Sequence, residues 1–200
     1  MTIRSKMLAL AAMLPLAALA SPVAAHNQGA KSTASTMTAA AAAPITRAEV
    51  EAAQQAWGNA LVAISTEYER NGQAAAKRLA EQVIDSAYGY DMGPVLFKPT
   101  LAAAPQTFRT ERDGALAYFV GGNANYANDK GFALMGWRDV DFTNAGILTN
   151  GNTATSLGNV TFTDSKGNKT TVDKTFGYVR GADGKLRIVL HHSSLPYKAS

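Results

Sequence analysis

The stretch RIVLHHSSLPY, residues 187–197, decides how the C-terminal part of this chain folds. It begins as an apolar β-strand pattern and then places two histidines next to two serines. Because successive side chains of a strand point to opposite faces, His191 and Ser193 share one face, while His192 and Ser194 share the other. The pattern therefore predicts that an imidazole and a hydroxyl line one pocket together.

Further strands are predicted upstream of this one. Two hairpins turn at residues 164–168 and 181–184, between runs rich in Val, Thr, Phe and Tyr. Shorter β-like runs precede them, at residues 95–97 (VLF), 107–110 (TFRT) and 115–122 (ALAYFVGG). We expect the last of these to be a strand in which Tyr118 shares a face with Leu116 and Val120. Glycines in and beside these runs are typical of bulges, which curve a sheet.

Helices are predicted before the strands. Thr46 and Glu49 fit a capping box, and apolar residues then recur at three-, four- and seven-residue spacing. We expect a first helix that ends near residues 71–72 and a second over residues 73–87. Helices followed by antiparallel strands predict an α+β cone, in which a strongly curved antiparallel sheet wraps around the N-terminal helices and encloses a pocket.

The N-terminus has the pattern of a secretory signal peptide. Arg4 and Lys6 precede an apolar run over residues 7–20, and small residues offer cleavage after Ala20 or Ala25. The run falls short of the ~20 apolar residues that a spanning helix needs, which argues against a membrane anchor. We therefore expect export, to the periplasm in a bacterium.

Three segments are expected in the chain. The signal peptide covers residues 1–25, and a flexible tether rich in Ala, Ser and Thr covers residues 26–44. The tether has too few large apolar side chains to offset the entropy of ordering it. A single α+β domain then covers residues 45–200, which is ample for one hydrophobic core.

Charge and cysteine content exclude several function classes. The net charge of +4 falls to +2 without the leader, and no Lys/Arg run is interleaved with aromatic residues, so we expect no nucleic-acid partner. Cysteine is absent, which rules out a thiol nucleophile and a thiolate metal site. The folded domain must rely on its core instead of on disulfides.

Few residues in the domain are candidates for a catalytic role. Thr100 follows Pro99, which holds the preceding residue extended, while Tyr118, His191 and Ser193 lie in apolar runs. Each of them also has an ordinary structural explanation, as a turn residue, a core aromatic, a satisfied histidine or a strand-end serine. No nucleophile elbow or Ser-Lys pair is present.

A histidine-based metal site is poorly supported. The chain has three histidines, and His26 lies in the leader or the tether. Catalytic zinc usually takes three protein ligands, and His191 and His192 point to opposite faces of their strand. A metal site would need one imidazole and recruited carboxylates.

Several segments, taken together, resemble the iota-class carbonic anhydrases. The similarity covers about residues 45–197. Five stretches carry it, AYGYDMGPVLFKPT (87–100), QTFRTERDGALAYFVGG (106–122), NDKGFALMGW (128–137), VDKTFGYVR (172–180) and GKLRIVLHHSSLPY (184–197). FKPT, AYFVGG and the terminal HHSS are the most specific of them.

The resemblance implies a fold, a reaction and a set of residues. The fold is a ketosteroid-isomerase-like cone, also called nuclear transport factor 2-like, and the reaction is the reversible hydration of carbon dioxide to bicarbonate. Metal-free members hold bicarbonate with a threonine, a tyrosine and a serine, which correspond to Thr100, Tyr118 and Ser193 here, with His191 close by. Zinc is the alternative cofactor, because metal dependence has been proposed for other members.

A metal-free site needs some other way to activate water. Bulk water has a pKa near 15.7, which zinc lowers to about 7 in other carbonic anhydrases. We expect Thr100, Tyr118 and Ser193 to form a hydroxyl cage that orients carbon dioxide and stabilises its developing charge, with His191 as proton acceptor. The charges of Lys98 and Arg109 would favour a bound anion if they reached the pocket mouth. A solvated surface position is the simpler expectation for both residues.

Two other function classes fit the same fold. An isomerase or cyclase would use a roomy apolar cavity and a carboxylate base, for which Asp85, Asp139 and Asp141 are candidates. A non-enzymatic binding or assembly module would fill its own pocket. We also expect a homodimer, to which aromatic side chains would contribute if they project from the sheet, namely Trp137, Phe162 and Tyr178.

Overall fold

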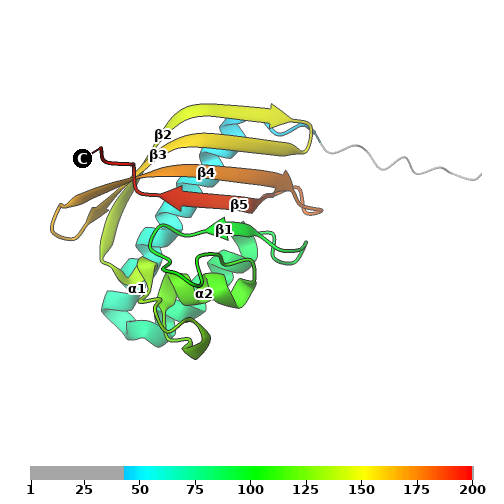
Figure 1. The fold of residues 1–200 in the computed structure, drawn as a ribbon. Helices are drawn as coiled ribbons and strands as arrows, with labels where there is room; N and C mark the ends of the chain where they lie inside the picture. The colour runs from blue at the N-terminus through cyan, green and yellow to red at the C-terminus, as the bar shows by residue number, and fades with distance from the viewer. Residues whose placement is uncertain (1–42, 200) are drawn as a thin grey trace, which may run out of the picture. The chain divides into compact units, whose positions relative to one another are not determined.

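The computed structural model describes residues 43–199, and Figure 1 shows their ribbon. The predicted signal peptide and nearly all of the predicted tether lie outside the described residues. The helical part consists of α1 (Arg47–Ala87), α2 (Arg112–Val120) and two 3-10 turns, η1 (Ala124–Tyr126) and η2 (Phe132–Leu134). Within residues 43–199, no helix combines the length and the apolar character that crossing a bilayer requires.

Helix α1 begins at the predicted capping box. The Thr46 hydroxyl accepts a hydrogen bond from the Glu49 backbone N–H, and a Glu49 carboxylate oxygen accepts one from the Thr46 N–H. Gly72 has a φ of 79°, so the helix kinks there. A residue with a side chain would be strained in this conformation. The element labelled α1 thus consists of two helices that meet at a kink, and the predicted break at residues 71–72 is confirmed.

A five-stranded sheet forms the other layer. It consists of β1 (Leu96–Lys98), β2 (Trp137–Asn150), β3 (Thr153–Asp164), β4 (Lys169–Arg180) and β5 (Leu186–Ser194), in the order β1-β5-β4-β3-β2. The four long strands pair antiparallel through the two predicted hairpins. The short β1 pairs parallel with β5, so the sheet is mixed. In Figure 1, α1 passes behind the sheet and α2 lies below β1.

Bulges and one glycine contact let the long strands bend. Register shifts interrupt the β2–β3 pairing between Asn144 and Gly146 and the β4–β5 pairing between Gly177 and Tyr178. A Cβ atom added at Gly158 would lie 2.2 Å from the Thr143 carbonyl oxygen, so only glycine fits there. These features agree with the curved sheet that the glycine pattern predicts.

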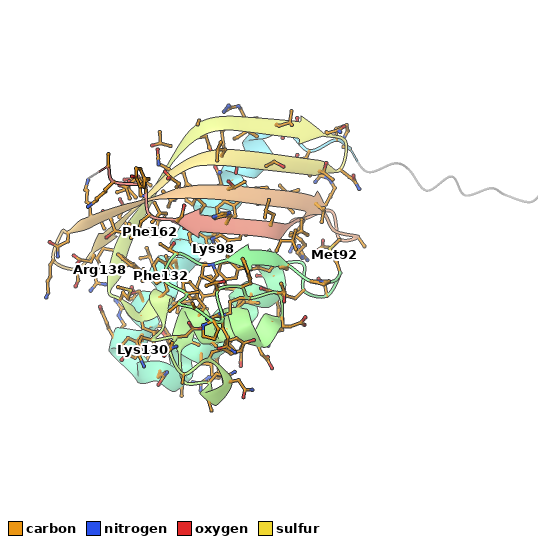
Figure 2. All side chains as sticks on the ribbon, viewed as in Figure 1. Met92, Lys98, Lys130, Phe132, Arg138 and Phe162 are labelled. Atoms are coloured by element: carbon orange, nitrogen blue, oxygen red, sulfur yellow. The ribbon has the colours of Figure 1, made fainter. Side chains whose placement is uncertain are left out.

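Aromatic side chains fill the space between helices and sheet. The rings that were considered for an interface, those of Trp137, Phe162 and Tyr178, are all at least 96% buried within this one chain. They belong to the core and are not available to a partner. Phe162 and its neighbour Phe132, labelled in Figure 2, meet edge to face at 5.2 Å between ring centroids.

The prediction for residues 115–122 was wrong. Residues 112–120 form helix α2, which ends where Gly121 adopts a φ of 64° and donates its N–H to the Ala117 carbonyl. Every residue from Gly114 to Val120 is buried, so the run has no polar face whose period would separate a helix from a strand. Residues 107–110 likewise form no strand, although Arg109 donates its N–H to the Phe97 carbonyl on β1.

Candidate functional site

Strand β5 places its four polar side chains as the alternation predicts. His191 and Ser193 are buried on the inner face, with 2% and 1% of their surface exposed, whereas His192 is exposed. The two imidazoles therefore point to opposite sides of the sheet. In residues 43–199 no group of three His, Asp or Glu side chains is arranged to hold a metal ion.

Thr100 reaches Ser193 across ninety-odd residues of sequence. β1 lies beside β5, with Phe97 opposite His191, and the chain leaves β1 through the buried Pro99. This path brings the Thr100 Oγ1 atom to 2.5 Å from the Ser193 Oγ atom. The Lys98 ammonium donates to the Ser193 carbonyl at 2.9 Å, so its side chain fastens β1 to β5. Lys98 is half-buried, and Figure 2 shows it beside β5.

Tyr118 joins these hydroxyls from helix α2. Its ring is stacked on that of Phe132, with 5.5 Å between centroids. Burial raises the pKa of the Tyr118 hydroxyl, and the Leu101 backbone N–H and the Thr100 side chain, which lower it, offset that effect only in part. Tyr118 is therefore a neutral hydrogen-bond donor at physiological pH, close to Thr100.

A cavity of about 270 Å³ opens beside Tyr118. It is lined by Leu101, Tyr118, Asn128, Asp129, Lys130, Gly131, Phe132 and Met135. This space exceeds the needs of a triatomic molecule and its hydrated anion. Thr100 and Ser193 are not among its lining residues, so the three hydroxyls do not all line this cavity.

The imidazole of His191 is engaged at both nitrogens. Its Nδ1 atom lies 2.9 Å from the Tyr88 hydroxyl, which also accepts the Trp57 indole N–H at 2.9 Å. Its Nε2 atom lies 3.0 Å from the Lys174 Nζ atom. Burial, with a smaller contribution from the Lys174 charge, holds the pKa of His191 well below its ordinary value. His191 is thus a neutral imidazole with Phe97 stacked on it at 4.3 Å.

Lys174 is a site residue that the sequence reasoning did not select. Its side chain is 95% buried, and its Nζ atom lies 4.4 Å from the centroid of the Trp57 ring. Burial lowers the pKa of Lys174 to about 7. A signal was present, because Val172, Lys174 and Phe176 share one face of a strand, so the alternation places a lysine among apolar side chains.

Arg109 is buried as well, but it has a full set of partners. Its guanidinium contacts both oxygens of Asp129, with the shortest distances at 2.8 Å, and it donates to the Gln106 and Phe108 carbonyls. Asp129 lines the cavity beside Tyr118. The expectation of a solvated position for Arg109 was therefore wrong, since the ion pair ties the segment before α2 to the cavity wall.

The carboxylates considered for an isomerase lie elsewhere. Asp85 is exposed and forms an ion pair with Arg112 at 2.6 Å. Asp139 and Asp141 are exposed on β2. None of the three lines the cavity beside Tyr118.

Comparisons with known proteins point to one family. A model of the metal-independent carbonic anhydrases matches residues 48–195. A metal-independent carbonic anhydrase from Nostoc sp. is 63% identical over 154 residues, which are 77% of this chain and 75% of that protein. The crystal structure of a cyanobacterial iota-carbonic anhydrase in complex with bicarbonate superposes with a TM-score of 0.77 at 62% identity, over 78% of this chain and 95% of that one.

These matches confirm the expectations that came from the sequence motifs. The α+β fold agrees with that of the iota-carbonic anhydrase, and the description of the family as metal-independent agrees with the expectation that no metal cofactor is needed. The match also spans both the FKPT segment and the terminal strand with its two histidines and two serines. By family model, sequence identity and structure, the chain belongs to the metal-independent, iota-class carbonic anhydrases.

Proposed function

We propose that this domain catalyses the reversible hydration of carbon dioxide to bicarbonate, with Thr100, Tyr118 and Ser193 as its substrate-binding and catalytic hydroxyls. The observation that carries the proposal is the 2.5 Å contact between the Thr100 and Ser193 hydroxyls, next to a neutral, buried Tyr118. Family membership supports the reaction, and this cluster supports the choice of residues.

The three hydroxyls act as fixed dipoles around the reacting carbon. As water attacks carbon dioxide, negative charge grows on the two oxygens of the gas, and hydroxyl donors already in place stabilise it without reorganising. Tyr118 is held protonated by its burial, so it can only donate to such an oxygen. Thr100 and Ser193 can each donate or accept, so one of them can orient the attacking water while the other binds the product.

The proton released from water needs an acceptor. His191 is the candidate from the sequence, and it lies two residues from Ser193 on the same strand face. Its nitrogens are bonded to Tyr88 and Lys174, so in this role it receives the proton through one of these partners and releases a proton to the other. His191 is then part of a relay and not its terminus.

The test is hydration by metal-depleted protein. Full-length protein would be chelated extensively, assayed for residual metal and mixed with carbon dioxide in a stopped-flow instrument with a pH indicator. We expect turnover to persist at metal contents far below one ion per chain. Activity that disappears on chelation and returns in proportion to added zinc would reject the metal-free hydroxyl cage.

Residues outside the described part support export. A basic start, an apolar run over residues 7–20 and small residues before Ala25 are typical of a signal peptide. We propose cleavage of the leader and release into the periplasm, which N-terminal sequencing of the processed protein would test.

We also propose a homodimer. Several large apolar side chains are exposed on the domain, on β1, on the segment before α2 and on the long strands, namely Leu96, Phe108, Leu148 and Leu157. Such side chains favour an interface, because its core takes apolar groups away from water. Sedimentation of the processed protein would give twice the monomer mass.

A further inference from the structure

Lys174 is a buried amine without an acidic partner. Among residues 43–199, none of the ion pairs includes it. Its Nζ atom lies within 5.4 Å of three ring centroids, those of Trp57 on α1, Phe162 on β3 and Phe176 on β4. Aromatic faces attract a cation, while burial disfavours it. The surroundings of Lys174 therefore suit both an amine and an ammonium group.

Lys174 lies directly beside the proposed site. In the antiparallel β4–β5 pair it is opposite Ser193, and both side chains are buried on the inner face. Opposed residues of such a pair have Cβ atoms about 4.5–5.5 Å apart. A charge on Lys174 would thus act on an anion held by Ser193 across a short distance and through protein instead of water.

The hydrogen bonds around His191 favour an uncharged Lys174 in the structure as it stands. The Trp57 indole can only donate, so the Tyr88 oxygen accepts, and the Tyr88 proton is free to bond the Nδ1 atom of His191. The Nε2 atom of a neutral His191 then carries the other proton and donates it to Nζ, which must offer a lone pair. This arrangement satisfies every donor from Trp57 to His191.

A charged Lys174 is compatible with the same positions. An ammonium group would donate to the Nε2 atom, and the proton of His191 would lie on Nδ1, facing the Tyr88 oxygen. The change requires a different tautomer of His191 and a rotation of the Tyr88 O–H bond away from Nδ1, without movement of the ring atoms. The pair of Lys174 and His191 can therefore gain or lose one proton while the domain stays folded.

We propose that Lys174 supplies the buried positive charge that accompanies bicarbonate, taking up a proton when the anion occupies the hydroxyl cage and giving it up when the anion leaves. This inference rests on the proposed function. Hydration turns one water and one carbon dioxide into bicarbonate and a proton, so the proton taken up equals the one released. Neutral hydroxyls alone would leave the product anion buried without a counter-charge.

Other charged groups near Lys174 do not provide a switchable charge. From α1 and its end, Trp57 and Tyr88 face the amine or its partner, and from β5 only His191 among the two adjacent histidines does. The Lys98 ammonium lies on the far side of Ser193, half-exposed and bonded to the Ser193 carbonyl. Arg109 is neutralised by Asp129.

Thermodynamic linkage makes the coupling measurable. If bicarbonate favours the charged amine, the bound anion raises the pKa of Lys174. Bicarbonate then binds more weakly as the pH rises above the pKa that Lys174 has in the absence of the anion. We would label the lysine side chains of the full-length protein with ¹³C and follow the Lys174 signal, assigned through bonds, from pH 6.5 to 9.5 with and without bicarbonate. Saturating bicarbonate should raise its midpoint by one pH unit or more.

Variants separate this charge from the fold. Bicarbonate dissociation constants would be measured by NMR titration at pH 7 and pH 9. The native protein should bind about tenfold more weakly at the higher pH, as should a Lys169→Met control on the exposed part of β4. Lys174→Met should bind weakly and equally at both pH values, while its rate with carbon dioxide, which is uncharged, falls by a smaller factor.

Two results would overturn the proposal. One is a Lys174 signal that titrates near pH 10.5 or does not move with bicarbonate in a protein that hydrates carbon dioxide; this would remove the coupling and leave the proposed function intact. The other is a pH dependence of binding that survives in Lys174→Met. Native protein without hydration activity would instead reject the proposed function itself. The native titration decides the question even if the variant fails to fold.

Discussion

Among residues 43–199, two cationic side chains are buried, those of Arg109 and Lys174, and their surroundings differ. Arg109 lies against Asp129 with three contacts of 3.0 Å or less. Lys174 lies against a neutral imidazole and three aromatic rings, with no carboxylate. A guanidinium keeps its charge at any physiological pH, whereas burial lowers the pKa of an amine, so that its charge can change near neutral pH. The first cluster is therefore built to remain fixed, and the second is built to change its charge.

The proposed hydroxyl cage lies between these clusters. Asp129 and Tyr118 line the same cavity, and Ser193 is opposite Lys174 across the β4–β5 pair. The arginine pair holds the wall of the site, and the lysine pair borders the hydroxyls that would bind the anion. Loss of the first should therefore be seen mainly in stability, and loss of the second mainly in pH dependence.

The largest effect is expected from breaking the arginine pair. Asp129→Asn would leave Arg109 buried without its counter-charge, at a cost of about 3–5 kcal/mol in the free energy of unfolding. Urea denaturation followed by far-UV circular dichroism would measure it. Replacing both partners, Arg109→Met with Asp129→Leu, should restore part of the loss, because no uncompensated charge remains. A single variant that costs less than about 1 kcal/mol would contradict the fixed role.

The next largest effect separates chemistry from stability. Tyr118→Phe and Ser193→Ala should each lower the turnover of carbon dioxide hydration by about 10²–10³-fold, the usual cost of removing one donor to a developing oxyanion. The unfolding free energy should change by no more than about 1–2 kcal/mol. Stopped-flow assays of chelated protein would measure the rates.

Controls for the hydroxyls come from the same strand and from the surface. Ser194→Ala alters the serine on the opposite face of β5, and Tyr197→Phe alters a tyrosine that is 90% exposed. Both should keep native rates. Near-native rates in both cage variants would reject the hydroxyl mechanism.

The third prediction concerns the lysine pair and has a defined sign. The pKa of Lys174 is lowered to about 7 in the folded domain, so between pH 7 and the ordinary lysine value of 10.5 the unfolded chain binds more protons. Unfolding free energy should thus rise from pH 7 to pH 9. Lys174→Met should abolish this rise and be more stable at pH 7, by on the order of 2 kcal/mol, since the lost ring contacts offset part of the gain.

The same pH series sharpens the comparison of the two cations. Arg109→Met removes a charge that does not titrate, so its destabilisation should be the same at pH 7 and pH 9. Lys169→Met, on the exposed part of β4, should follow the native curve. Guanidinium unfolding at each pH measures all three. A native protein whose stability is flat over this range would show that Lys174 keeps its charge.

Alternation predicted the faces of residues 191–194 at the end of β5, although the bulge in the β4–β5 pair buries Ile188 as well as His191. Long-range contacts were predictable only through family motifs. The two-residue period of a strand predicted that His191 and Ser193 share a face and that His191 and His192 lie on opposite faces. The Thr100–Ser193 contact joins residues 93 apart, and no local pattern encodes it. Only the resemblance to known carbonic anhydrases predicted that Thr100 and Ser193 belong to one site.

Two failures of sequence reasoning have different physical causes. The run around Tyr118 is buried on all sides, so it lacks the amphipathic period that distinguishes a helix from a strand. Arg109 looked like a surface cation, because its partner Asp129 lies 20 residues away in the sequence. Lys174 was overlooked even though its place in the alternation was readable, since a buried lysine without an acid is rare.

The smallest effect tests which imidazole belongs to the lysine pair. His192 is exposed on the outer face of β5, so His192→Gln should leave the unfolding free energy within about 0.5 kcal/mol and hydration unchanged. His191→Gln keeps a polar group but cannot shift a proton between two nitrogens. It should therefore change the pH midpoint of Lys174, which NMR would follow. If His192→Gln moved that midpoint as far as His191→Gln, the charge on Lys174 would depend on the general field of the strand instead of on its hydrogen bond to the inner imidazole.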